Sequence, residues 1–323
     1  MTNTEPPIVN SNVLNNATNT TITPIIKYSH NNINKMIQQY ESLPNDEVPQ
    51  RTPNQCHDRY HDVLPGEDRV KVMYNGNQLY INANHAFGDM ILTQAPLIHG
   101  LLNFWLMVAQ HNVDLIVMLT RVMESGRAKA NVYWPKEGDN LTFRQNGATI
   151  ITIKNLSEHI DGECVYRDLH IDYCGKVLSV THIQYIGWPD CGVPRGTSYI
   201  KNIMCKIQQS NRSVIHCSAG IGRTGALALA IQLLRCDDSP ITVLKELRTK
   251  RPKSIQTAEQ FKFALQLVNC IYIEKSMPRA LPHVQRKFVI DTYLSDRDRM
   301  ISSLGLPRSI KHDHSQRALA HSS

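Results

Sequence analysis

The 323-residue sequence has no apolar run close to the roughly 18 residues that a membrane-spanning helix requires. Its first residues, MTNTEPPIVNSN, lack the basic and apolar regions of a secretory signal peptide, so we expect no export of the chain. The eight cysteines include no CxxC pair, which favours reduced thiols in a cytoplasmic protein over a disulfide framework. The sequence therefore predicts no metal site, and nothing in it indicates a cofactor.

A strong excess of charge is also lacking. The formal net charge is +7, with 35 Lys and Arg against 28 Asp and Glu. Part of this excess lies in residues 275–323, which hold nine Lys and Arg against four Asp and Glu. Because no aromatic residues are interleaved with a basic stretch, we expect no nucleic-acid partner. A solvated basic surface of this kind would suit an enzyme whose substrates are anions.

The sequence does contain the pattern of one globular domain, with 41% hydrophobic and 20% charged residues. Residues 1–28 are rich in Asn and Thr and carry only two charges, Glu5 and Lys27, which predicts a disordered segment. Across residues 29–276, helical and strand patterns alternate without a linker or an internal repeat. Residues 277–323 are predicted to form a basic tail with one candidate helix, RKFVIDTYLSDRDRMI.

The periodicity of the domain indicates its fold class. The apolar run VDLIVMLTRV, residues 113–122, is typical of a strand buried on both faces of a sheet. Residues 168–188 alternate between polar and apolar side chains like a pair of antiparallel strands. Helical patterns occur in HGLLNFWLMVAQH, TSYIKNIMCKIQQS, TGALALAIQLLR and TAEQFKFALQLVNCI. We therefore predict an α/β fold in which helices flank a central, twisted, mixed β-sheet.

One short segment, HCSAGIGRTG at residues 216–225, carries the strongest chemical signal. It follows a predicted strand, RSVIH, and leads into a helix that begins near Gly222. Backbone N–H groups in such a turn converge on one point and can hold an anion there. Ala219 and Gly220 keep the turn free of bulky side chains, and Arg223 offers a planar fork of donors to two oxygens of a phosphate.

The same electrostatic field favours the thiolate of Cys217 over its thiol, which would make it a nucleophile at neutral pH. The alternative is a buried structural thiol, as most cytosolic cysteines are. A cysteine and an arginine six residues apart would not decide between these interpretations. The complete ten-residue string favours a phosphate held over a thiolate.

These features resemble the cysteine-dependent, tyrosine-specific protein phosphatases. The resemblance covers about residues 30–276, and further motifs occur in the family's order: DRYHDVLP (58–65), YINAN (80–84), TQAP (93–96), FWLMV (104–108), RVMESGRAKANVYWP (121–135), WPDCGVP (188–194) and SIQTAEQ (254–260). As a small chain with a single catalytic domain, it is also similar to the phosphatases carried by polydnaviruses of parasitic wasps. That similarity would place it in the cytoplasm of a host cell.

The resemblance implies an enzyme that hydrolyses phosphotyrosine in proteins through a phosphocysteine intermediate. In that reaction Cys217 attacks phosphorus, while Asp190 protonates the departing tyrosine oxygen and later acts as a base. Arg223 holds the phosphoryl oxygens, and Gln256 orients the attacking water. Thr224 donates a hydrogen bond to the leaving thiolate.

The resemblance also implies which residues surround the substrate. Tyr60 would form the wall of a deep slot, and Asp62 would accept hydrogen bonds from the peptide backbone. The remaining substrate-binding positions are Ser218, Ala219, Gly220, Ile221, Gly222 and Gln260. The supporting positions are His216 behind the loop, Glu124 as the partner of Arg223, and Lys129, which would meet the closed acid loop.

Several residues depart from the family's pattern. They are Cys191 after the acid, Ala95 in TQAP, Ala130, His61, and Lys253 at the predicted pocket rim. Two alternatives remain beside a tyrosine phosphatase. A dual-specificity phosphatase shares the cysteine and arginine but lacks the DRYHDVLP loop and the QTAEQ segment. A phosphotyrosine-binding trap without turnover would need to have lost the cysteine, the arginine or the acid.

Overall fold

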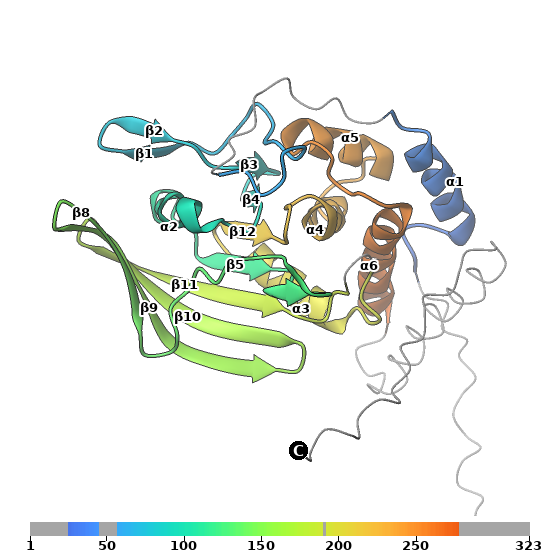
Figure 1. Cartoon of the computed structure of the whole chain (residues 1–323). Coiled ribbons are helices and arrows are strands. Elements are labelled where there is room, and N and C mark those ends of the chain that lie inside the picture. The colour runs from blue at the N-terminus through green and yellow to red at the C-terminus, as the bar shows by residue number, and fades with distance from the viewer. Residues whose placement is uncertain (1–24, 45–56, 190–191, 278–323) are drawn as a thin grey trace, which may run out of the picture. The chain divides into compact units, whose positions relative to one another are not determined.

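The computed structural model describes residues 25–44, 57–189 and 192–277 (Figure 1). The chain divides into two compact units, one formed by Ile26–Ile271 and the other by Met1–Ile25 together with Tyr272–Ser323. The sheet and the site described below belong to the first unit. Among the described residues, no helix is both long and apolar enough to cross a bilayer. The predicted tail helix and the predicted disordered N-terminal segment lie almost entirely outside the described residues.

The centre of the first unit is a mixed sheet of eight strands in the order β3-β4-β12-β5-β11-β10-β9-β8. Their bounds are β3 Ala83–Ala86, β4 Met90–Thr93, β12 Ser213–His216, β5 Leu115–Met118, β11 Lys176–Tyr185, β10 Cys164–Tyr173, β9 Ala148–Asp161 and β8 Asn140–Gln145. The pairs β4–β12, β12–β5 and β5–β11 are parallel. All other neighbours in this sheet are antiparallel. Two small hairpins, β1 Val72–Tyr74 with β2 Asn77–Leu79 and β6 Met123–Glu124 with β7 Arg127–Ala128, stand outside it.

The helices are α1 His30–Glu41, α2 Leu101–Gln110, α3 Ser198–Gln209, α4 Gly222–Leu233, α5 Pro240–Lys250 and α6 Ala258–Ser276, with a short 3₁₀ turn, η1 Ile98–Gly100. Four of them, α2, α3, α4 and α6, confirm the predicted helical patterns, although α6 continues beyond the end of its predicted pattern to Ser276. The helix α5 was not predicted, although its start carries a clear signal. Ser239 accepts a hydrogen bond from the Thr242 amide, and Pro240 occupies the first turn.

Two of the strand predictions meet different outcomes. Residues 168–188 do form an antiparallel hairpin, β10–β11. The buried strand predicted over residues 113–122 is real but shorter, because β5 covers only Leu115–Met118. Leu119 has already left the ladder and donates its N–H to the carbonyl of His216. The apolar run continues beyond the strand because Leu119 and Thr120, which follow it, are buried in a loop at the end of the sheet.

The strand β12 positions the segment HCSAGIGRTG, which carries the strongest chemical signal in the sequence. Parallel neighbours flank β12 on both sides, and all four of its residues are buried. The strand leads directly into α4, and Figure 1 shows this helix immediately after β12. Almost every residue of α4 is buried, as expected of a helix that is apolar on all sides. The turn between β12 and α4 is thus held by two rigid elements.

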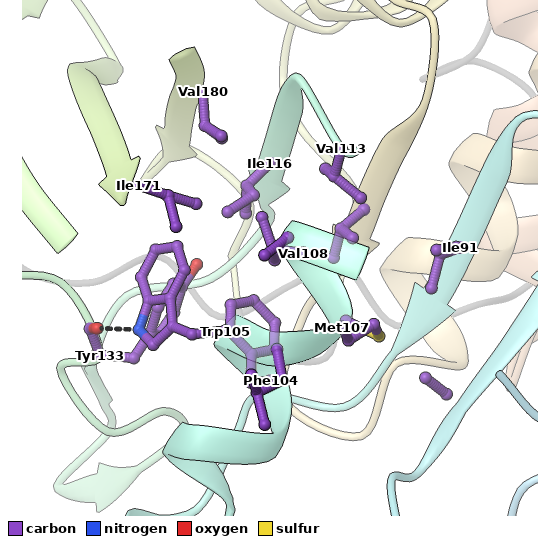
Figure 2. Close-up of a cluster of buried hydrophobic side chains, with 14 of the residues drawn as sticks. Ile91, Phe104, Trp105, Met107, Val108, Val113, Ile116, Tyr133, Ile171 and Val180 are labelled. Atoms are coloured by element: carbon purple, nitrogen blue, oxygen red, sulfur yellow. Dashed lines mark hydrogen bonds between the residues drawn. The ribbon is translucent and has the colours of Figure 1, made fainter. Parts of the chain in front are cut away.

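A hydrophobic cluster anchors α2 against the sheet (Figure 2). Phe104 and Trp105 on α2 pack with Ile116 of β5 and Ile171 of β10. The indole Nε1 of Trp105 donates a hydrogen bond of 2.9 Å to the backbone carbonyl of Tyr133, drawn as a dashed line in Figure 2. This contact fixes the segment that carries Tyr133, which reaches the candidate site.

We expect Trp105→Phe to destabilise the protein by about 1–3 kcal/mol, because it leaves the buried Tyr133 carbonyl without this donor. Urea unfolding followed by circular dichroism measures the change. Val177→Ala is the control, since that side chain on β11 is 63% exposed and its loss should change the stability by less than about 0.5 kcal/mol. Equal stabilities for Trp105→Phe and the wild type would contradict this account of the anchor.

Candidate active site

The candidate site is the turn of residues 217–221 between β12 and α4. His216 is the last residue of β12, and Gly222 is the first of α4. A turn after the carboxyl end of a central parallel strand, at the start of a helix, is a favoured place for anions. There the helix dipole presents its positive end.

The carbonyl oxygens of this turn are held from outside. Five consecutive carbonyls, from Cys217 to Ile221, accept hydrogen bonds from groups behind the loop. The pairs are His216 Nδ1 with Cys217 O (2.9 Å), Ala95 N with Ser218 O (2.9 Å), Arg251 Nη2 with Ala219 O (3.0 Å), Arg251 Nε with Gly220 O (3.2 Å) and Ile255 N with Ile221 O (2.9 Å).

This arrangement dictates where the amides of the turn point. In a planar trans peptide, the carbonyl and the following N–H point in opposite directions. Because the carbonyls of residues 217–221 point outward, the N–H groups of residues 218–222 point inward. Within the described part of the chain, no acceptor is found for the N–H groups of Ser218, Ala219, Gly220 or Ile221. The turn is therefore a ring of inward donors that suits an anion.

Two glycines make room for this ring. Gly220 has a φ of +73°, and a Cβ there would collide with the backbone carbonyl of Thr93. A Cβ at Gly222 would lie 2.6 Å from Gln256 Oε1 and 2.9 Å from Gln260 Nε2. Both glutamine side chains therefore lie against the turn, close to the expected position of the anion.

Arg223 and Glu124 form a buried ion pair beside the turn. Nη1 and Nη2 of Arg223 donate to Oε1 and Oε2 of Glu124 at 2.8 and 2.7 Å, and Nη1 also reaches the Leu119 carbonyl at 3.0 Å. Burial alone would raise the pKa of the Glu124 carboxyl. Hydrogen bonds from Arg223, the Arg121 amide and the Thr120 hydroxyl outweigh it and hold that pKa below its usual value. The carboxylate thus stays charged and fixes the plane of the guanidinium.

Cys217 is buried at the floor of the turn, with 6% of its surface exposed. Nearby in sequence, Thr224 Oγ1 is a buried hydroxyl without a hydrogen-bond partner among the described residues. His216 is fully buried, and burial lowers the pKa of its imidazole to about 4. This histidine is therefore neutral at pH 7 and contacts the Cys217 carbonyl.

Polar side chains contact the turn at Ser218, and a further polar pair, Asp62 with Lys253, is close to these contacts in sequence. Ser218 Oγ donates to the Lys129 carbonyl at 2.7 Å, so the Tyr60 hydroxyl, 2.9 Å away, is the donor in its contact with Ser218. Asp62 Oδ2 lies 3.1 Å from Lys253 Nζ, and the hydrogen bond from Lys253 lowers the pKa of Asp62. Both partners are partly solvated, so this pair adds little to stability.

The predicted acid, Asp190, and the neighbouring Cys191 lie outside the described residues. The ends of their loop are described. Trp188 is buried against Phe263, and its indole Nε1 donates to the Gly192 carbonyl at 2.9 Å. Of the departures from the family's pattern, Ala95 is buried and still supplies a donor to the turn through its backbone. Ala130 is buried and His61 is exposed.

Arg251 is a site residue that the sequence analysis missed. Besides two carbonyls of the turn, its guanidinium contacts Asn82 Oδ1 at 2.7 Å and Asn84 Oδ1 at 3.1 Å. Burial lowers the pKa of Arg251 to about 10, so it remains a cation at neutral pH. In the sequence it stands in the basic stretch LRTKRPK, where only burial distinguishes it from its neighbours.

A family model described as "Protein-tyrosine phosphatase" matches residues 54–270. The human "Tyrosine-protein phosphatase non-receptor type 18" is 33% identical over 258 residues, which cover 73% of this chain and 55% of the relative. The human "Tyrosine-protein phosphatase non-receptor type 2" is 32% identical over 234 residues, covering 67% and 56%. "Tyrosine-protein phosphatase 1" of Caenorhabditis elegans is 32% identical, and the match covers 67% of this chain but only 23% of the relative.

The solved structures agree with these matches. The crystal structure of the catalytic domain of human protein tyrosine phosphatase non-receptor type 18 superposes with a TM-score of 0.63 at 29% identity. The match covers 75% of this chain and 94% of that one. Because the chain spans only about half, or less, of the full-length relatives, what those proteins do as a whole does not transfer to it directly.

Gly220→Ala tests the tight packing of the turn. We expect it to lower the free energy of unfolding by about 1–3 kcal/mol, because the new Cβ meets the Thr93 carbonyl. It should also abolish the rise in melting temperature that tungstate, an oxyanion probe, produces in the wild type. Urea unfolding measures the first effect, and differential scanning fluorimetry with and without tungstate measures the second.

Gly175→Ala is the matched control. Gly175 has a similar φ of +72°, but a Cβ there meets nothing within 4 Å. This variant should therefore show only the cost of backbone strain and should keep the full shift with tungstate. If both variants responded to tungstate alike, Gly220 would not be needed to shape the anion site.

Proposed function

The chain belongs to the protein-tyrosine phosphatase family, and we propose that it hydrolyses phosphotyrosine in proteins through a phosphocysteine intermediate. The observation that carries the proposal is the ring of inward amides, with Cys217 at its floor and Arg223 at its side. A dianionic phosphate fits such a ring because each of its oxygens can accept from an amide or from the guanidinium.

In the first step, the Cys217 thiolate attacks phosphorus in line with the bond to the tyrosine oxygen. The S–P bond forms as the P–O bond breaks, and the bonding electrons pass to the phenolic oxygen. Asp190 transfers a proton to that oxygen, which is worth about 10²–10⁴ in rate for a general acid. The inward amides and Arg223 stabilise the charge that builds up on the equatorial oxygens.

In the second step, water attacks the phosphocysteine and the thiolate leaves. Asp190 accepts a proton from the water, and Gln256 orients it. Support for the role of Gln256 comes from the position of its side chain against Gly222. Thr224 donates its hydroxyl hydrogen to the departing thiolate, which accords with the lack of another partner for this buried hydroxyl among the described residues. Cys217 and Asp190 both return to their starting states.

The rim sets the depth of the slot and so selects phosphotyrosine. Phosphotyrosine carries its phosphate at the end of a rigid ring, whereas phosphoserine carries it one carbon from the backbone. Tyr60, tied to Ser218 through its hydroxyl, forms the wall and stacks on the substrate ring. Asp62 accepts hydrogen bonds from the substrate backbone, with Lys253 beside it. Lys129 contacts the acid loop when that loop closes, and Gln260 lines the pocket beside Gln256.

We infer that the partners are phosphotyrosine-containing proteins and that the enzyme acts in the cytoplasm. The relatives of types 2 and 18 are named as non-receptor phosphatases. The six described cysteines, among them Cys164 and Cys217, are all free, which accords with a reducing compartment. The resemblance to polydnaviral phosphatases would make this the cytoplasm of an infected host cell.

Cys217→Ser should abolish turnover of a phosphotyrosine peptide, because a serine hydroxyl does not ionise in this turn at neutral pH. Asp190→Ala should lower kcat by about 10²–10⁴ but leave peptide binding nearly unchanged, since the acid acts mainly in the transition state. Steady-state kinetics and isothermal calorimetry measure the two quantities. Cys205→Ser, at an exposed thiol on α3, is the control and should match the wild type. Turnover by Cys217→Ser at the wild-type rate would rule out the mechanism.

Tyrosine selectivity is tested with matched phosphotyrosine and phosphoserine peptides. The wild type should cleave the former far faster, and Tyr60→Ala should reduce that ratio by removing the wall of the slot. Tyr60→Phe keeps the ring and loses only the hydroxyl contact with Ser218, so it should retain most of the selectivity. Similar wild-type rates on both peptides would favour a dual-specificity phosphatase. Tight binding without turnover would favour a phosphotyrosine-binding trap.

A further inference from the structure

A chain of buried polar side chains leads from the candidate site into the antiparallel half of the sheet. It starts at the Cys217 carbonyl, which lies 2.9 Å from His216 Nδ1. His216 Nε2 lies 2.7 Å from the Tyr133 hydroxyl, and that hydroxyl lies 2.7 Å from His182 Nε2. His182 Nδ1 lies 3.2 Å from Arg167 Nη1. Both histidines and Tyr133 have no exposed surface.

The register of the sheet explains how these groups meet. Arg167 on β10 lies directly opposite His182 on β11 and opposite Glu158 on β9. Arg167 Nε donates to Glu158 Oε2 at 2.6 Å, and its guanidinium lies 4.3 Å from the centre of the Trp134 ring. The guanidinium is thus fixed by an ion pair and by an aromatic face. Only 5% of the residue's surface is exposed.

The two ends of this chain impose one direction on its hydrogen bonds. A guanidinium has donors only, so His182 Nδ1 must accept from Arg167. The proton of the neutral His182 ring then lies on Nε2, which donates to the Tyr133 oxygen. Tyr133 in turn donates its single hydrogen to His216 Nε2. The proton of His216 therefore lies on Nδ1 and is donated to the carbonyl of Cys217.

Burial favours the neutral form of both imidazole rings. Burial, aided by the charge of Arg167, lowers the pKa of His182 well below its usual value, and burial lowers that of His216 to about 4. Burial also raises the pKa of the Tyr133 hydroxyl. At neutral pH, the only charges in this series of hydrogen-bonded groups are therefore those of Arg167 and its partner Glu158.

Tyr133 is the residue at which the donor-to-acceptor direction of these hydrogen bonds could be lost. Its hydroxyl has one hydrogen but lies 2.7 Å from the Nε2 atoms of two histidines. Were His182 to carry its proton on Nδ1, that N–H would face the N–H of Arg167, and both Nε2 atoms would compete for the hydrogen of Tyr133. Arg167 removes this competition because it obliges His182 to donate through Nε2.

A second branch from Arg167 reaches the other side of the site. Its Nη1 lies 3.3 Å from Gln184 Oε1, and Gln184 Nε2 donates to the Thr120 carbonyl at 3.2 Å. The Thr120 hydroxyl donates at 2.9 Å to Oε1 of Glu124, the partner of the loop arginine. One guanidinium thus connects with both the cysteine carbonyl and the carboxylate that orients the loop arginine.

We propose that Arg167 is a positioning residue for the active site. By donating to His182 it selects the tautomers of His182 and His216, and so keeps the Cys217 carbonyl turned out of the anion-binding turn. The inward direction of the Ser218 amide follows, because that N–H belongs to the same peptide as the Cys217 carbonyl. The effect on catalysis rests on the proposed phosphatase function, whereas the tautomers can be observed without it.

The tautomers can be read from the ¹⁵N shifts of the imidazole nitrogens in protein labelled on histidine. In the wild type, we expect a protonated Nε2 on His182 and a protonated Nδ1 on His216. Arg167→Met keeps an unbranched, apolar stem that is shorter than that of arginine, and it removes every donor. It should shift His182 toward the Nδ1–H form, leave His216 as a mixture of tautomers, and lower kcat for a phosphotyrosine peptide by up to about 10².

Three further variants separate this effect from a merely structural one. Glu158→Gln removes the ion pair but leaves the donors of Arg167 facing His182, so its tautomers and kcat should match the wild type. Arg167→Lys again supplies only donors, so it should restore much of the wild-type tautomer populations and of the wild-type kcat. Tyr133→Phe interrupts the chain between the histidines. Combining it with Arg167→Met should lower kcat little further, because both changes break the same connection.

Folding of each variant is checked by circular dichroism, and Arg167→Lys and Tyr133→Phe keep the test decisive if Arg167→Met fails to fold. A His216 that stays protonated on Nδ1 alone in Arg167→Met would overturn the proposal, and so would a kcat within twofold of the wild type in Arg167→Met or in Tyr133→Phe. The wild-type tautomers in a protein without phosphatase activity would instead refute the proposed function and leave the role of Arg167 in tautomer selection intact.

Discussion

The proposed anion site depends on holding five successive backbone carbonyls away from its centre. A turn left to itself would expose a mixture of carbonyls and amides, and the carbonyls would repel a phosphate. Here each carbonyl from Cys217 to Ile221 has a donor behind it. The inward amides then follow from the planarity of the peptide, and no further device is needed to orient them.

The donors behind the turn come from widely separated parts of the sequence. A backbone amide at Ala95, the side chain of Arg251 and an amide at Ile255 all converge on it. Such convergence has an entropic cost, and the well-packed strand β12 and helix α4 that flank the turn help to offset it. Gly220 adds a left-handed backbone angle that only a residue without a Cβ can adopt so close to Thr93.

Three arginines illustrate how one residue type serves different purposes. Arg223 has its plane set by Glu124 and is the arginine that we propose for binding the anion, whereas Arg251 binds carbonyls of the same turn. Arg167 is further off and acts through neutral hydrogen-bonding groups. In each case the guanidinium contributes donors in a fixed plane and no acceptor, so it can impose a direction on the groups that it meets. A lysine would supply charge at each place but not the same geometry.

The sequence by itself determined the fold class, most of the helices, the β10–β11 hairpin and the segment that forms the turn. These features depend on local periodicity and on a string of residues whose chemistry is legible without neighbours. It did not reveal α5, although Ser239 caps this helix and its buried residues Val243, Leu244 and Leu247 follow helical spacing, and it overestimated the length of β5. Only the tertiary structure distinguished Arg251 from the basic residues around it and joined Arg167 to Cys217 through Tyr133. Those roles arise from contacts between residues distant in sequence, where burial and strand register decide which polar groups face each other, and no local pattern records them.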